Sequence, residues 1–215
     1  MSLRDYWLSK LFFDLQSSAV AAEFRAERDK VLARYPLDER VKKAIAEQAM
    51  RAGFEPSVSH RLKLDHGSCI PLWRMELERM PKIVPLLVNS IEPPMPSLRR
   101  CYQWGSLLKN SIDTYAEPLR VAILATGGLS HSIGEKTMGA IHEDFDRATI
   151  RLFGLSDRSL LEFLERGLPT HGNGSEEVRN WLVAHGAAGG RGFELVDYLP
   201  VPTVIVGCGF ASWRV

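Results

Sequence analysis

The stretch Arg120-Val-Ala-Ile-Leu-Ala125 runs directly into Thr126-Gly-Gly-Leu-Ser-His131, and the predicted fold is built around this junction. The first segment is almost entirely apolar, which predicts a strand buried in a sheet. The two glycines that follow permit a tight turn and the close approach of a ligand to the backbone. His131 comes next on the emerging turn, where an imidazole can act as a general acid or base. The residues alone also allow a glycine-rich turn with a surface histidine.

Strands and helices alternate along the rest of the chain. Period-2 alternation or a mostly apolar composition predicts further strands at 58–65, 82–91, 193–199 and 203–206. Amphipathic spacing, capping residues and terminal glycines predict helices at 18–34, 38–53, 97–112, 144–153, 156–167 and 175–186. This order predicts one α/β domain over residues 1–215, with a central mixed, largely parallel sheet flanked by helices. In such sheets, functional side chains lie at the carboxyl ends of the strands.

The composition is that of an ordinary globular protein. Hydrophobic residues make up 45% and charged residues 25% of the 215 positions, which excludes a disordered tail or a collagen-like fibre. The formal net charge of +1 favours neither nucleic acid nor a membrane surface as a partner. Three cysteines without a CxxC pair indicate buried thiols in a reducing compartment. The apolar runs are too short to cross a bilayer, so a cytoplasmic location is expected.

Two further positions carry side chains suited to chemistry. Asp65-His-Gly67 directly follows a predicted strand, so His66 is expected on a turn at the same edge of the sheet as His131. An ordinary loop histidine is the alternative. Glu177 is expected in the first turn of the helix that Ser175 caps. A carboxylate at a helix N-terminus is commonly there only to complement the helix dipole, and that alternative is also open.

Taken together and in this order, five motifs resemble the class III extradiol ring-cleaving dioxygenases, of the type of the catalytic β subunit of protocatechuate 4,5-dioxygenase. The motifs are Leu64-Asp-His-Gly67, Ala125-Thr-Gly-Gly-Leu-Ser-His131, Asp144-Phe-Asp146, Glu177-Val-Arg-Asn-Trp-Leu-Val183 and Val206-Gly-Cys-Gly-Phe210. The resemblance extends from about Leu62 to the C-terminus. The Gly-Gly-Leu-Ser-His element is the most specific of them, and the ordered set is more specific than any member.

The resemblance implies a non-haem Fe(II) centre and a catechol-type substrate. Glu177 is implied as a carboxylate ligand of the iron, in a set of two histidines and one carboxylate that leaves positions for the aromatic diol and O2. His131 is implied as the acid/base for the catechol proton, and His66 as a group that hydrogen-bonds the substrate. The substrate would also contact Gly127, Gly128 and Ser130. The ring would open beside, rather than between, its two hydroxyl-bearing carbons.

The chain departs from the family at the metal. Both iron-binding histidines of the family precede the Asp-His-Gly element, whereas no histidine precedes His60 here. The resemblance therefore implies that the N-terminal strand with its two metal histidines is missing. One hypothesis is an enzyme whose histidines come from a partner chain or from further sequence. The other is a non-catalytic relative that serves as a binding or structural module. The apolar residues Trp7, Leu11, Phe12 and Phe13 predict a homo-oligomer or association with a second subunit.

Overall fold

The computed structural model of the chain describes residues 38–59, 66–75, 81–155 and 157–214. These residues form two compact units, and the boundary between them falls within the first described helix. The smaller unit holds the described residues among 38–47 and 55–86, and the larger unit holds 48–54 and those from 87 onward. The predicted helix at 18–34 lies outside the described residues.

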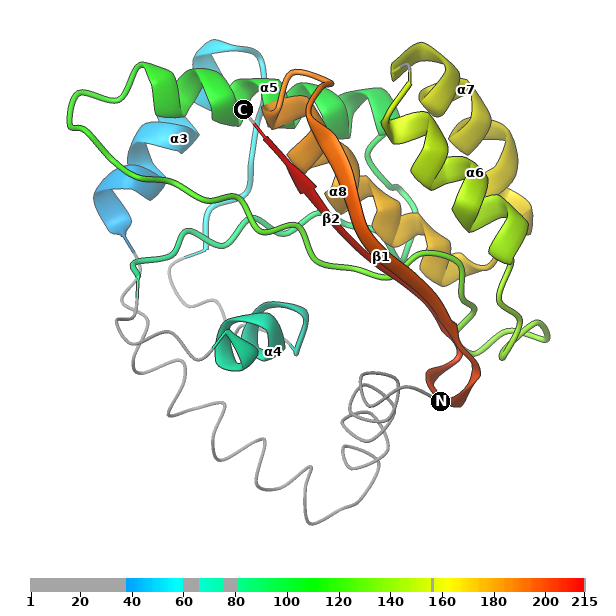
Figure 1. Cartoon of the computed structure of the whole chain (residues 1–215). Coiled ribbons are helices and arrows are strands. Elements are labelled where there is room, and N and C mark those ends of the chain that lie inside the picture. Colours follow the sequence, from blue (N-terminus) through cyan, green and yellow to red (C-terminus); the bar gives the residue numbers. More distant parts are fainter. Residues whose placement is uncertain (1–37, 60–65, 76–80, 156, 215) are drawn as a thin grey trace. The chain divides into compact units, whose positions relative to one another are not determined.

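Helices make up most of the regular structure (Figure 1). In chain order the elements are α3 (Glu39–Arg51), α4 (His66–Arg74), α5 (Leu98–Asp113), α6 (Glu143–Phe153), α7 (Asp157–Gly167), η1 (Leu168–Thr170), η2 (Asn173–Glu177), α8 (Val178–Ala187), β1 (Phe193–Val201), η3 (Pro202–Val204) and β2 (Val206–Trp213). Within the described ranges, no helix combines the length and the apolar character that a membrane span requires.

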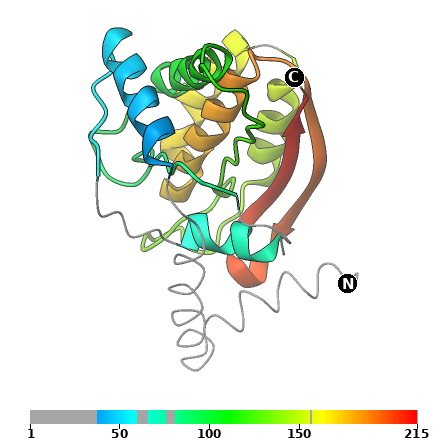
Figure 2. The same ribbon diagram turned by 90° about the vertical axis from the view of Figure 1, so that its left-hand side faces the viewer.

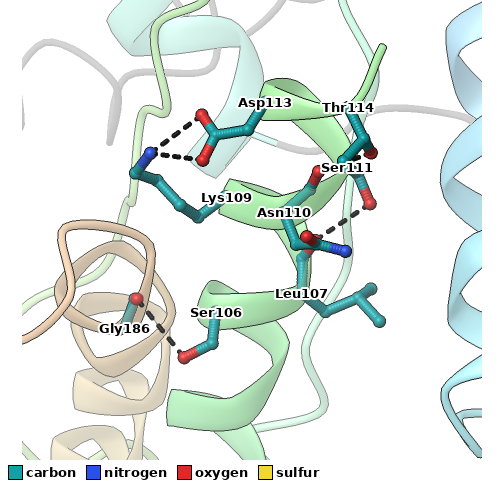
Figure 3. Close-up of polar contacts among 8 residues, drawn as sticks. All are labelled: Ser106, Leu107, Lys109, Asn110, Ser111, Asp113, Thr114 and Gly186. Carbon is teal, nitrogen blue, oxygen red and sulfur yellow. Dashed lines mark hydrogen bonds and ion pairs between the residues drawn. The ribbon is translucent and has the colours of Figure 1, made fainter.

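Helices α5 and α8 pack against each other in the larger unit (Figures 1 and 2). Two glycines allow this close approach: a Cβ atom on Gly105 would overlap the carbonyl oxygen of Val183, and one on Gly186 would overlap that of Tyr102. The Ser106 hydroxyl donates a hydrogen bond to the Gly186 carbonyl at 3.5 Å (Figure 3). Gly186 was predicted to end its helix, but it lies inside α8, where its missing side chain makes room for α5.

The hydrophobic core of the larger unit surrounds this helix pair. Its fully buried members include Leu160 and Leu164 of α7 and Leu182 of α8. Cys101 is also buried in this core, as predicted, whereas Cys208 is only partly buried. Since apolar burial contributes about 25 cal/mol per Å² removed from water, this cluster supplies the main stabilisation of the unit.

The sheet of the described residues is an antiparallel pair, β1 and β2, running from Phe193↔Trp213 to Val201↔Val206. The predicted strand at 193–199 is confirmed as β1. The prediction of a strand at 203–206 is wrong, because η3 and the left-handed Ile205 (φ +56°) reverse the chain before β2 begins at Val206. Helices and strands are both present, as an α/β class requires, but the predicted largely parallel central sheet is not seen within the described ranges.

Two predicted strands do not form. Residues 82–91 have only one isolated bridge, at Ile83, and residues 120–125 have none. Leu87 and Ile91 are 63% and 72% exposed, and Val121 and Leu124 are 48% and 47% exposed. An apolar run becomes a strand only where a neighbouring strand takes up its backbone hydrogen bonds, and the described residues supply none here.

The helix predictions succeed where local signals decide. Ser97 caps α5 by accepting a hydrogen bond from Arg100 N at 3.2 Å, and Gly53 after α3 has φ +74°, as its C′ position predicts. Residues 144–153 and 157–167 are helical as predicted; Ser156 lies outside the described residues. The prediction for Ser175 is wrong. Its hydroxyl donates to the His171 carbonyl, so residues 173–177 form η2 and α8 begins at Val178.

Candidate active site

The loop from Thr126 to Ser132 is held by two other segments of the larger unit. Leu129 N donates to the Gly207 carbonyl at 2.9 Å, and Gly207 N donates to the Ser130 carbonyl at 3.0 Å, so the loop pairs with the start of β2. Gly174 N donates to the His131 carbonyl at 3.1 Å. The loop is therefore fixed on both sides of Ser130, between β2 and η2.

The His131 ring is buried and has a defined hydrogen-bonding state. The residue is 4% exposed, and its Nδ1 lies 2.7 Å from the Leu129 carbonyl oxygen. Because a carbonyl oxygen can only accept, Nδ1 must carry the proton in this contact. In the neutral imidazole this assignment leaves the lone pair on Nε2, which is the atom available to take a proton.

Glycines 127 and 128 bring Glu177 to the same loop. The Gly128 N–H donates to Glu177 Oε2 at 2.6 Å, and Trp181 Nε1 donates to the Gly127 carbonyl at 3.3 Å. A Cβ atom on Gly127 would lie 2.9 Å from the Glu177 Cβ, and one on Gly128 would lie 3.3 Å from His131 Cε1. These two glycines thus lie between Glu177 and His131, and the structure brings those two predicted site residues together.

Two more glycines, which the sequence reasoning missed, shape the space around His131. A Cβ atom on Gly174 would overlap the His131 imidazole, and one on Gly172 would overlap the His131 carbonyl. Gly172 also has φ +91°, which side chains rarely adopt. No local pattern in the sequence indicated these contacts, because His131 lies about 40 residues before the two glycines.

Asp146 is a fully buried carboxylate directly behind the loop. Its Oδ1 accepts from Ser130 N at 2.8 Å, and its Oδ2 accepts from the Ser130 hydroxyl at 2.8 Å and the Tyr198 hydroxyl at 2.7 Å. Burial raises the pKa of Asp146, against the opposing effect of these hydrogen bonds. Burial is also the main cause that raises the pKa of Tyr198. Sequence reasoning identified Asp146 only as part of a motif and gave it no role.

The fully buried Ser130 hydroxyl is shared between two neighbours. It donates to Asp146 and accepts from His142 N at 2.7 Å. Contact of Ser130, Gly127 and Gly128 with a substrate stays a prediction.

His142 and His171 contact each other near the start of α6, where His142 is the N-cap residue. The His171 ring stacks on Phe145 with centroids 4.1 Å apart and meets the His142 ring edge-on at 4.8 Å. His142 is partly exposed, and its buried Nε2 has no hydrogen-bond partner among the residues that the structure describes. A surface depression of about 510 Å³ lies beside His171, between α6, α7 and η1. Neither His131 nor Glu177 lines it.

His66 is the remaining predicted site residue. It begins helix α4 in the smaller unit, so its predicted place on a turn is wrong. Its side chain is outside what the structure describes, and its role as a substrate contact stays a prediction. The preceding residues 60–65 of the predicted strand lie outside the described residues, and Val58 and Ser59 are not in a strand.

The residues described do not by themselves fit an Fe(II) ion. Within the described ranges, no three side chains of histidine, cysteine, aspartate or glutamate are grouped so that they could hold a metal. Glu177 is a single carboxylate whose Oε2 is hydrogen-bonded to Gly128, and a lone carboxylate holds a divalent iron weakly.

Comparison with known proteins gives the class to which the chain with this loop and Glu177 belongs. Residues 15–209 match the family described as the catalytic LigB subunit of aromatic ring-opening dioxygenase. The chain belongs to this family.

Individual relatives carry more particular names. The chain is 33% identical over 150 residues to gallate dioxygenase of Pseudomonas putida, covering 66% of this chain and 43% of that protein. It is 28% identical over 226 aligned positions to 2,3-dihydroxyphenylpropionate/2,3-dihydroxicinnamic acid 1,2-dioxygenase of Paraburkholderia phymatum, covering 81% of this chain and 70% of that protein. The chain therefore spans less than half of the gallate dioxygenase.

Proposed function

We propose that this chain provides the acid/base half of an extradiol ring-cleavage site for a catechol-type aromatic diol and O2, of the protocatechuate 4,5-dioxygenase type. The observation that carries the proposal is that the Gly127-Gly128 turn lies against both the buried imidazole of His131 and the carboxylate of Glu177. Membership of the ring-opening dioxygenase family supports the reaction class.

In this proposal His131 moves the substrate proton. One catechol hydroxyl loses its proton to His131 Nε2, so that an O–H bond breaks and an N–H bond forms. The imidazolium that results keeps its Nδ1–H directed at the Leu129 carbonyl, and a hydrogen bond from a charged donor is stronger than one from a neutral donor. The Leu129 carbonyl therefore stabilises the protonated ring, and Nε2 later returns the proton to the opened product.

Fe(II) is the proposed cofactor, with Glu177 as one carboxylate ligand. The other ligands would be supplied by residues outside those described or by a partner chain, in a homo-oligomer or with a second subunit. The alternative function is that of a non-catalytic member of the family, which serves as a binding or structural module.

Anaerobic Fe(II) loading of the purified chain, followed by an oxygen-electrode trace with a catechol-type diol, tests the proposal. Protocatechuate, gallate and 2,3-dihydroxyphenylpropionate are suitable probes. The expected result is bound iron and diol-dependent O2 uptake. A chain that binds no Fe(II) and consumes no O2 would favour the binding-module alternative.

Matched variants separate the roles of the two residues. Glu177→Gln is expected to weaken iron binding by more than about tenfold, because even loss of a group that hydrogen-bonds a metal ligand typically costs that much. Glu176→Gln is the control, because the neighbouring Glu176 carboxylate pairs with Arg179 instead. His131→Ala is expected to keep the iron and lose O2 uptake by about a hundredfold or more. Normal iron content in Glu177→Gln would show that the ligand assignment is wrong.

A further inference from the structure

The buried carboxylate of Asp146 has no part in the chemistry proposed above, yet it is fully buried and fully hydrogen-bonded. Taking a carboxylate out of water is costly unless it is well paired. Two of its three donors belong to Ser130, the residue next to His131. The third, the Tyr198 hydroxyl, comes from β1 and fixes the carboxylate from the other side.

A single peptide group links Asp146 to His131. The amide between Leu129 and Ser130 is a rigid plane, with the Leu129 carbonyl at one end and the Ser130 N–H at the other. Asp146 Oδ1 holds the N–H end at 2.8 Å, and His131 Nδ1 bonds to the carbonyl end at 2.7 Å. Any rotation of this plane that loses the bond to Asp146 also turns the carbonyl away from the His131 ring.

The same link acts through charge. A carboxylate that accepts from the N–H of an amide polarises that amide and makes its carbonyl oxygen a better acceptor, because chained hydrogen bonds strengthen one another. The Leu129 carbonyl then holds the proton of His131 on Nδ1 more firmly. The arrangement resembles a direct carboxylate–histidine pair, with one peptide group inserted between the two side chains.

We propose that Asp146 is the positioning residue that sets the tautomer and the orientation of His131 through the Leu129–Ser130 peptide. Asp146 thereby keeps Nε2 free to accept a proton. The role of Nε2 as the acceptor of the substrate proton rests on the proposed ring-cleavage function. The tautomer of His131 does not depend on that function. A purely structural Asp146 would tie α6 to the loop and to β1 without any effect on the proton of His131.

Nitrogen NMR of the metal-free full chain, with ¹⁵N-labelled histidine and at alkaline pH, where imidazoles are neutral, separates these cases. The His131 signals are those lost in His131→Ala. In the unmodified chain His131 is expected to show the pattern of a single Nδ1–H tautomer. In Asp146→Asn that single pattern is expected to be lost, with the Nε2–H form appearing, since the amide cannot accept from all three donors.

A matched control is available at Asp157, whose carboxylate accepts from a different buried histidine, His185. Asp157→Asn is expected to change the His185 signals and leave those of His131 unchanged. Tyr198→Phe removes one donor from Asp146 and is expected to give a smaller amount of the second His131 tautomer. If Asp146→Asn loses its near-UV circular dichroism and so does not fold, the His131 signals of Tyr198→Phe test the inference instead.

An unchanged His131 pattern in every folded variant of Asp146 and Tyr198 would overturn the inference. If the chain binds iron and consumes O2, Asp146→Asn is also expected to lower the rate by about tenfold to a hundredfold, with little change in bound iron. If even the unmodified chain consumes no O2, the proposed function fails, and the NMR result still judges the role of Asp146.

Discussion

Two buried polar clusters fix the β1–β2 pair to its helices, and they differ in which group is buried. In the acid cluster, formed by Asp146, Ser130 and Tyr198, the fully buried group is a carboxylate. In the histidine cluster, formed by His185, Asp157 and Trp213, the fully buried group is an imidazole. Its Nε2 contacts Asp157 at 2.8 Å, and its Nδ1 accepts from Trp213 Nε1 at 2.8 Å.

The difference shows that similar polar contacts can affect the candidate active site in one cluster and only the stability of the fold in the other. The acid cluster receives backbone and hydroxyl donors from the loop that carries His131, so a change there reaches the candidate active site. The histidine cluster joins α8, α7 and the end of β2 among the rings of Phe153 and Phe193. Its carboxylate, Asp157, is 38% exposed. We therefore expect the histidine cluster to stabilise the fold and to have no effect on the candidate active site.

Asp146→Ala is expected to produce the largest effect. It leaves the N–H and O–H of Ser130 and the hydroxyl of Tyr198 without their acceptor in a buried place. Unsatisfied buried donors cost about 1 to 3 kcal/mol each, so the free energy of unfolding should fall by about 3 to 5 kcal/mol. Urea denaturation measures this change. A decrease in the free energy of unfolding of less than about 1 kcal/mol would mean that water enters the cluster and takes the place of the carboxylate as acceptor.

His185→Phe tests the other side of the comparison. Phenylalanine keeps an aromatic ring against Phe153 but leaves Trp213 Nε1 without an acceptor, so we expect a loss of about 2 kcal/mol in urea denaturation. The iron affinity and the His131 tautomer should not change. A shift of the His131 NMR signals in this variant would show that the two clusters are coupled and that the histidine cluster does affect the candidate active site.

Tyr198→Phe removes one hydrogen bond of the acid cluster and keeps the ring. A loss of about 1 kcal/mol is expected, because Asp146 retains two donors from Ser130. Arg147 provides a check on packing, since its guanidinium lies 5.0 Å above the Tyr198 ring and should stay there in the variant. A loss as large as that of Asp146→Ala would mean that Tyr198, rather than Ser130, is the principal partner of the carboxylate.

The acid cluster also shows where sequence reasoning stops. The helix at 98–113 could be predicted because Ser97 and its amphipathic spacing are local signals. The loop Gly127-Gly128 with His131 could be predicted as a candidate site for the same reason. Asp146 could not, because its partner Tyr198 lies 52 residues away and nothing in the spacing indicates their contact. Gly174 was missed similarly, since only the folded chain brings it against His131.

Strand pairing failed for a related reason. An apolar run such as 120–125 predicts a strand only if another strand lies beside it, and this condition depends on residues distant in the sequence. The error at Ser175 came from competition between two local hydrogen bonds. Its hydroxyl can serve as a cap or bond to the carbonyl four residues back, and the structure uses the second option.

The dependence of stability on pH gives the smallest effect and the sharpest test, because the two clusters contribute with opposite signs. Burial lowers the pKa of His185 below its ordinary value of 6.5, against the raising effect of Asp157. The folded state then binds fewer protons than the unfolded state, so the contribution of His185 is complete above pH 6.5 and is lost as the pH falls toward the lower folded pKa. The slope for one proton cannot exceed about 1.4 kcal/mol per pH unit.

Asp146 has the reverse sign. Its pKa is raised from 3.8, so the folded state holds its proton longer and the contribution is complete below pH 3.8 and is lost as the pH rises through the raised pKa. Urea denaturation across a pH series should therefore show that His185→Phe reduces the loss of stability as the pH falls below 6.5. In Asp146→Asn, the part of the free energy of unfolding that Asp146 contributes at low pH, and that falls as the pH rises, should instead be missing. If both variants change the pH dependence of the free energy of unfolding in the same direction, then burial does not lower the pKa of His185 while raising that of Asp146.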